Sequence, residues 1–150
     1  MTDVTGGKKV TAVNNESAIG AKMRYTTTGT DPVSTDSEWP SAGVTLDSAG
    51  STTFKVASFV GTSKGAVATK AVTVTKLTAP TITAGENSFT IAGGDAEIDA
   101  DLYYRFGSSG SWTKYTEAVA ITETVTVNAY AKLKGYVDSN TASEEVEYTS

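Results

Sequence analysis

Residues 97–106 read EIDADLYYRF, and apolar and polar side chains alternate along this stretch. A period of two is the spacing of a β-strand, whose successive side chains point to opposite faces of a sheet. The pattern therefore predicts one long strand. Its predicted inward side chains are Ile98, Ala100, Leu102, Tyr104 and Phe106, and its predicted outward side chains are Glu97, Asp99, Asp101, Tyr103 and Arg105.

The signals around this strand occur twice in the chain, in residues 25–74 and again in residues 104–148. Tyr25 corresponds to Tyr104 at an offset of 79, and Phe54 corresponds to Val127 at an offset of 73. A longer loop in the first copy, residues 29–38, absorbs the difference, since loops accept insertions at small cost. The remaining predicted matches are Trp39 with Trp112, and residues 44–46 with residues 119–121. These matches predict that the chain contains two copies of one structural unit.

The expected fold class is all-β, with two tandem immunoglobulin-like antiparallel β-sandwiches. The chain has 26 Thr and only 4 Leu, a composition that suits pleated sheets better than packed helices. We expect domain 1 in residues 1–77 and domain 2 in residues 78–150, because Pro80 stops a strand just after a short link. In the first copy the predicted inward side chains are Ile19, Ala21, Met23 and Tyr25.

The ordered motifs resemble the immunoglobulin-like module at the C-terminus of chitobiases and hexosaminidases, a family also found in bacterial surface proteins and phage structural proteins. The resemblance is carried in the first copy by Tyr25, Thr26, Thr27, Gly29, Asp31, Pro32, Phe54, Lys55 and Gly61, and in the second by Tyr104, Val127, Ala129, Ala131, Gly135 and Ser139. These residues mark turns and core positions. The resemblance implies a spacer, accessory or adhesion role and carries over no catalytic residue.

Composition excludes several kinds of chemistry. The 150 residues include no Cys and no His, so the chain has no disulfide, no thiolate nucleophile, no Cys/His zinc site and no Ser-His-Asp triad. We expect no catalytic residue, no metal and no cofactor. We also expect no membrane span and recognise no signal peptide, so the chain stays in the cytoplasm, leaves by lysis or has lost a leader. Nucleic-acid binding is not expected at a pI of about 4.7.

An acidic stripe is the first candidate site. Asp95, Glu97, Asp99 and Asp101 would project from one face of the predicted strand, where they could hold Ca²⁺ if a loop added further oxygens. The alternative, which we favour, is a solvated sheet face, because no calcium-loop motif is present. We do not expect these residues to act as a glycosidase acid–base pair. Such a pair needs one protonated carboxyl group, and neighbouring carboxylates on an open face all stay ionised.

Aromatic side chains beside loops are the second candidate. Trp39 and Trp112 would suit sugar stacking, but their predicted recurrence in both copies favours core positions. Tyr103 and Tyr115 are predicted to be more exposed. Surface glycans therefore stay possible partners.

Charge is shared unevenly between the two predicted domains. Residues 1–77 carry 8 basic and 6 acidic side chains, and residues 78–150 carry 4 basic and 11 acidic ones. A polar molecule of this kind can dock its less acidic end on an acidic surface or stack with other copies. The predicted partner-binding residues are Lys8, Lys9, Lys22 and Arg24. Gly6 and Gly7 precede Lys8 and Lys9, a combination that could suggest phosphate binding. The glycines lack the spacing of a P-loop, so we expect them to form the entry to the first strand.

These observations together lead us to expect a non-enzymatic structural or binding protein. The first expectation is an auxiliary, or decoration, protein on the surface of a phage virion, with capsid proteins as partners, domain 1 on the shell and domain 2 projecting. The alternative is an accessory or spacer module of a secreted carbohydrate-active enzyme or adhesin, located outside the cell or at its surface.

Overall fold

A computed structural model describes all residues from Met1 to Ser150 and contains strands, two short 3-10 turns and no α-helix. The N-terminal half comprises β1 (Thr2–Val4), β2 (Gly7–Val10), η1 (Ser17–Ile19), β3 (Lys22–Thr26), β4 (Val44–Leu46), β5 (Gly50–Val60) and β6 (Ser63–Val74). The C-terminal half comprises β7 (Pro80–Gly85), β8 (Ser88–Gly93), η2 (Ala96–Ile98), β9 (Asp101–Phe106), β10 (Thr113–Lys114), β11 (Val119–Ala120), β12 (Val125–Lys132) and β13 (Ala142–Val146). The expected all-β class is confirmed.

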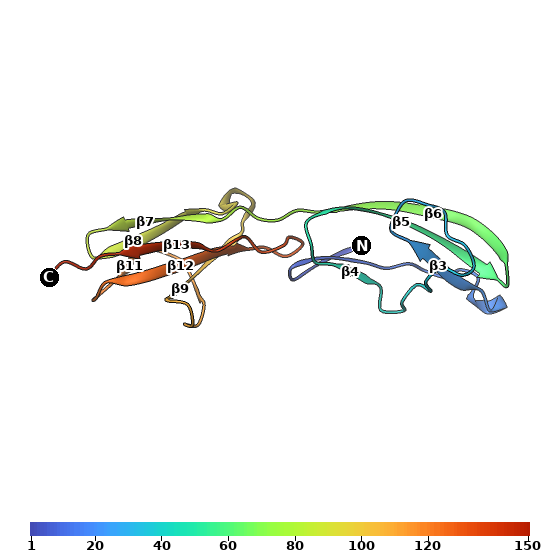
Figure 1. The fold of residues 1–150 in the computed structure, drawn as a ribbon, viewed down its shortest axis with the longest axis horizontal. Coiled ribbons are helices and arrows are strands. Elements are labelled where there is room, and N and C mark those ends of the chain that lie inside the picture. The colour runs from blue at the N-terminus through green and yellow to red at the C-terminus, as the bar shows by residue number, and fades with distance from the viewer.

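Each half contains two antiparallel sheets. The strand orders are β1-β2-β4 and β3-β5-β6 in the N-terminal half, and β11-β8-β7 and β10-β9-β12-β13 in the C-terminal half. Figure 1 shows the two halves lying end to end, with the C-terminus at one extremity of an elongated molecule. This architecture is compatible with β-sandwiches.

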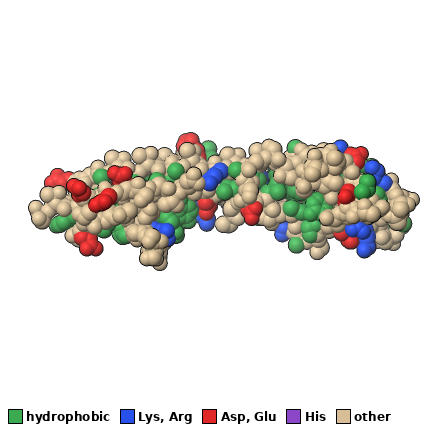
Figure 2. All heavy atoms as spheres, viewed as in Figure 1, with side chains coloured by type: hydrophobic (Ala, Val, Ile, Leu, Met, Phe, Trp, Pro, Cys, Tyr) green, Lys and Arg blue, Asp and Glu red, His purple; other side chains and the backbone are tan.

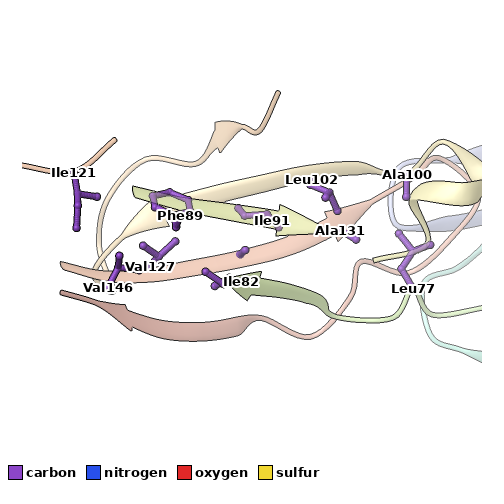
Figure 3. Close-up of a cluster of buried hydrophobic side chains, with 11 residues drawn as sticks. Leu77, Ile82, Phe89, Ile91, Ala100, Leu102, Ile121, Val127, Ala131 and Val146 are labelled. Atoms are coloured by element: carbon purple, nitrogen blue, oxygen red, sulfur yellow. The ribbon is translucent and has the colours of Figure 1, made fainter. Parts of the chain in front are cut away.

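Hydrophobic side chains from both sheets of a half meet in a buried cluster. Eleven buried residues form the C-terminal cluster, including Phe89 from β8 and Val127 from β12, both with no exposed surface (Figure 3). Four buried residues form the N-terminal cluster, which are Val10, Trp39, Phe54 and Val72. The N-terminal half therefore has the smaller core and the lower expected stability.

Matching strand pairings occur in the two halves. Tyr25 pairs with Val56 and Tyr104 pairs with Ala129, which preserves the offsets of 79 and 73. Both tyrosine side chains pack against the cluster of their half, as predicted. The pairing of Val44 with Val10, and of Val119 with Phe89, extends the correspondence to the other sheet.

The predicted strand over 97–106 is too long. Residues 96–98 form η2, and the strand begins only at Asp101, because Asp99 adopts a left-handed conformation with φ of 63° that ends the turn. The side chain of Ile98, in η2, is 43% exposed, so its predicted inward orientation is wrong. Ile19, in the equivalent turn η1, is 67% exposed and was wrong for the same reason. Phe106 pairs with the buried Val127 and contacts Phe89, so it faces inward as predicted, although its side chain at the strand end is 44% exposed.

The predicted correspondence of the two tryptophans is also wrong. The Trp39 N–H donates to the Met23 carbonyl, and in the C-terminal half the Tyr115 N–H donates to the equivalent Leu102 carbonyl. Tyr115 is therefore the structural counterpart of Trp39, and it packs against the C-terminal cluster instead of being exposed. Trp112 lies elsewhere, on the outer face of a sheet, where it contacts Tyr130.

The two halves are joined by hydrogen bonds as well as by the covalent chain. The Leu77 N–H donates to the Val137 carbonyl over 3.0 Å, and the Val137 N–H donates to the Thr75 carbonyl over 2.9 Å. The Gly135 N–H donates over 3.0 Å to the carbonyl of Val4, which belongs to the N-terminal half. The Leu77 side chain is buried in the C-terminal cluster. We define these contacts as the junction.

Candidate binding surfaces

The four predicted partner-binding residues do not form one patch. Lys8 and Lys9 are neighbours on β2, so they point to opposite faces of one sheet, whereas Lys22 and Arg24 lie on β3 in the other sheet. Figure 2 shows basic side chains at the far end of the N-terminal half and acidic side chains spread over the C-terminal half.

Three of these four cations already have acidic partners. The Lys8 ammonium lies 3.4 Å from a carboxylate oxygen of Asp3. The Glu38 carboxylate forms ion pairs with both Lys22 and Arg24, with its Oε2 atom 3.3 Å from the Lys22 ammonium and 3.7 Å from the Arg24 guanidinium. These pairs are solvated, so each contributes little to stability, but they reduce the net charge available to an external acidic surface.

The repeat contains a charge-swapped version of the Lys22–Glu38 pair. Asp101 occupies the position equivalent to Lys22, and Lys114 occupies the position equivalent to Glu38, as the pairing of Arg24 with Glu38 and of Tyr103 with Lys114 shows. Asp101 and Lys114 form an ion pair of 2.7 Å. Hydrogen bonding to Asp101 raises the pKa of Lys114. The predicted difference in charge between the two halves is therefore found at this position, but each charge is compensated within its own half.

The acidic stripe does not exist as a stripe. Asp95 and Asp99 flank η2, both in left-handed conformations, instead of alternating along a strand. The Asp95 carboxylate accepts hydrogen bonds from the backbone N–H and the hydroxyl of Thr78, which ties η2 to the chain just after the junction. No group of three or more acidic side chains lies close enough together to hold a metal ion.

An aromatic patch on the outer face of the β10-β9-β12-β13 sheet is the most distinctive surface. We define it as Tyr103, Arg105, Trp112 and Tyr130, all half-buried. Tyr103 and Tyr130 are cross-strand neighbours and stack with ring centroids 5.5 Å apart. Trp112 meets Tyr130 edge-on at 4.6 Å. The Arg105 guanidinium lies 4.5 Å from the centre of the Trp112 ring, a cation–π contact.

The patch combines apolar rings with polar groups at its border. Burial raises the pKa of the Tyr130 hydroxyl, an effect that nearby Lys132 partly opposes. The alternation in residues 97–106 predicted both Tyr103 and Arg105 to point outward, but Tyr130 was not singled out from the sequence. The signal for Tyr130 was the alternation in β12, where Val127, Ala129 and Ala131 are buried and the residues between them point outward.

The same outer face is covered in the N-terminal half. Pro32, in the long loop of residues 29–38, has a fully buried side chain. Asp31 of this loop lies 2.7 Å from Lys55 and 3.9 Å from Lys64. The hydrogen bond from Lys55 lowers the pKa of Asp31. With Tyr115 as the counterpart of Trp39, this loop is three residues longer than the corresponding loop of the C-terminal half. The longer loop covers the face that stays partly open and aromatic in the C-terminal half.

No protein-family model and no curated protein sequence matches this chain. The structure contains no helix with the length and hydrophobicity needed to cross a membrane.

Proposed function

We propose that this chain is a non-catalytic structural protein made of two tandem immunoglobulin-like modules, which attaches at one end to the surface of an assembly and projects the other end outward. The junction is the observation that supports this proposal. Backbone hydrogen bonds and the buried Leu77 side chain hold the two halves in line, so an attachment at one end fixes the position of the other.

A phage capsid is the setting that we propose first, with the chain as a decoration protein on the virion surface. Such a protein needs no catalytic residue. It stabilises the shell by mass action, because it binds the assembled state in preference to free subunits. We assign the attachment to the N-terminal half, because its balance of 8 basic and 6 acidic side chains is less repulsive toward a negative shell than the acidic C-terminal half.

Co-sedimentation with phage heads assembled without this protein tests the proposal. The purified chain should bind saturably, at a fixed number of copies per head. Charge reversal at Lys8 and Lys9 together should slow association more at low salt than at high salt, because exposed charges act mainly on the on-rate. Glu144→Lys with Glu145→Lys, two exposed residues of β13, should not weaken binding. Heads that bind no protein under any salt condition would contradict the capsid setting.

The aromatic patch favours a second candidate function. Stacked Tyr103 and Tyr130 with Trp112 beside them present ring surface and polar groups together, which suits the apolar faces and hydroxyls of sugars. In that case the chain is an accessory or adhesion module at a cell surface or on a secreted carbohydrate-active enzyme. Calorimetric titration with soluble polysaccharides tests this alternative: Trp112→Ala should abolish any binding heat, whereas Lys9→Ala in the other half should leave it unchanged. An unchanged heat with Trp112→Ala would contradict it.

A further inference from the structure

An apolar groove opens between β2 and β6 in the N-terminal half, with a volume of about 460 Å³. One wall is the chain that continues β2, residues 10–13, and the other wall is β6 around Ala66 and Ala68. Phe54 and Val56 of β5 lie at its base, and Met1 also lines it. Figure 2 shows hydrophobic side chains gathered on the visible face of this half.

The backbone along one wall of the groove has no partner. β1 pairs with β2 only as far as Lys9, and residues 11–13 make no backbone hydrogen bond. Val13 is 81% exposed. Unpaired backbone beside an apolar groove is the arrangement that accepts an added β-strand, since main-chain hydrogen bonds supply affinity and the groove receives alternate side chains.

The C-terminal half shows what fills the equivalent place. There β7 pairs with β8 along its full length, with Ile82 opposite Ile91 and Pro80 opposite Gly93. At the offset of 79, Ile91 corresponds to Ala12, which lines the groove, and Gly93 corresponds to Asn14, just beyond the wall formed by residues 10–13. β7 buries Pro80 and Ile82 between the sheets and packs beside β13, the counterpart of β6. In the N-terminal half the counterpart is the short strand β1, which pairs with β2 no further than Lys9 and leaves residues 11–13 unpaired.

Charge distinguishes the two ends of the groove. Lys70 lines the end near Phe54, its cross-strand partner, and takes part in no ion pair within 4.0 Å. Glu16, near Gly65, lines the other end and is likewise without an ion-pair partner. A strand that runs antiparallel to β2 would pass Glu16 first and reach Lys70 last. A strand whose charges complement the groove therefore carries a basic residue before it, near Glu16, and an acidic residue after it, near Lys70.

We propose that this groove is a docking site for one extended β-strand from another polypeptide. The strand runs antiparallel to residues 10–14, places an apolar side chain opposite Ala12, and carries basic and acidic residues in the order given above. The segment that contains β7 has this order itself, because Lys76 precedes the strand and Glu86 follows it. The proposal goes beyond the attachment function, since it names the site and the form of the partner whether or not the surface is a capsid.

The probe is a synthetic peptide with the sequence of residues 76–86, KLTAPTITAGE, added to the full-length chain. Hydrogen exchange followed by NMR should show new protection of the amides of residues 11–13. The same peptide with Ile82→Asp should give at least tenfold weaker binding. Absence of protection at residues 11–13 at saturating peptide would overturn the proposal, and so would equal binding of the Ile82→Asp peptide.

Matched variants of the chain localise the site. Ala68→Phe fills the groove, because Ala68 faces the same side as Val56, and should weaken peptide binding at least tenfold. Ala71→Phe, on the same strand but the opposite face, should change it less than twofold. The Lys70→Glu variant should bind the original peptide more weakly and should bind the peptide with Glu86→Lys more tightly. This charge swap tests the site even if the Ala68→Phe variant does not fold. Equal effects of the two Phe variants would contradict the site. Self-association of the free chain that Ala68→Phe abolishes would also contradict it, because the occupant would be a second copy.

Discussion

Individual aromatic residues differ sharply in what they contribute. Trp39 is 7% exposed and contacts Tyr25 at 5.1 Å and Phe54 at 5.7 Å between ring centroids, so it occupies the centre of a small core. Trp112 is half-buried on an outer face and contacts Arg105 and Tyr130. The two tryptophans of the chain therefore report on different halves and on different roles.

Replacement of each tryptophan should separate these roles. Trp39→Ala should lower the free energy of unfolding of the N-terminal half by about 3–5 kcal/mol, the usual cost of deleting a large buried aromatic. Trp112→Ala should cost about 1–2 kcal/mol, from the lost aromatic and cation–π contacts. Urea unfolding followed by circular dichroism measures both. Equal losses would show that Trp112 is a core residue after all.

The Tyr130 hydroxyl should titrate above the ordinary range of a tyrosine. Burial raises its pKa above the ordinary value of 10.0, because the charged phenolate loses solvation. Above pH 10 the unfolded chain releases this proton while the folded chain retains it, so stability falls as pH rises through the folded pKa. An ultraviolet titration should lose a tyrosinate step above pH 10 in Tyr130→Phe. A loss confined to pH values at or below 10 would refute the shift.

Sequence alone predicted the inward tyrosines but not the tryptophan correspondence, and the physical reason is clear. Tyr25 and Tyr104 lie within strands, where a period of two fixes the face of every side chain. Trp39 and Trp112 lie outside regular strands, where similar spacing does not guarantee similar placement. The correspondence is defined by the hydrogen bonds of Trp39 to Met23 and of Tyr115 to Leu102. These bonds join segments that are distant in sequence, so the local sequence pattern does not predict them.

At the scale of elements, the 3-10 turns before β3 and β9 decide which residues enter the sheets. The Ile19 N–H donates to the Glu16 carbonyl, and the Ile98 N–H donates to the Asp95 carbonyl, so the same turn is formed twice. Alternating hydrophobicity continues through both turns, and for that reason the sequence predicted one uninterrupted strand. The left-handed residues Gly20 and Asp99 end the turns, and only the glycine is a recognisable signal.

Glycine at position 94 should be required for the passage from β8 into η2. Its φ is +64°, and a Cβ atom there would lie 2.8 Å from Leu102 Cδ2 and 3.0 Å from Ala131 Cβ. Gly93→Ala is the matched control, with φ of +73° and nothing within 4 Å of the added atom. Both variants bear the left-handed cost of about 1–2 kcal/mol, but Gly94→Ala should lose about 1–3 kcal/mol more through overpacking. Equal melting temperatures of the two variants would disprove the clash.

At the scale of the whole molecule, Leu77 is a residue of the predicted domain 1 that packs in the core of the other half. It ends the predicted domain 1, yet its side chain is 4% exposed within the C-terminal cluster. The position of Pro80 suggested the division at 77/78, because proline stops strands, but the contact of Leu77 with residues far along the chain is not visible in sequence. The all-β class was predictable from the sequence, whereas the contacts across the junction were not.

Truncation should reveal this dependence. Residues 75–150 should be more stable than residues 78–150 by about 2–5 kcal/mol, because the longer fragment keeps the buried Leu77 side chain. Urea unfolding of the two fragments measures the difference, with residues 1–74 and 1–77 as the complementary pair, in which removal of Leu77 should cost little. Equal stabilities of the two C-terminal fragments would place the division at 77/78.

The central claim is that the two halves form one rigid rod, since only a rigid rod projects its far end to a fixed position. Residual dipolar couplings of the backbone amides in weakly aligned full-length chain test it most directly. A rigid rod should give a single alignment tensor, with the same magnitude and orientation for residues 1–74 and residues 78–150. Two tensors of different magnitude would show that the halves reorient independently, and would contradict both the junction and the projecting role proposed for it.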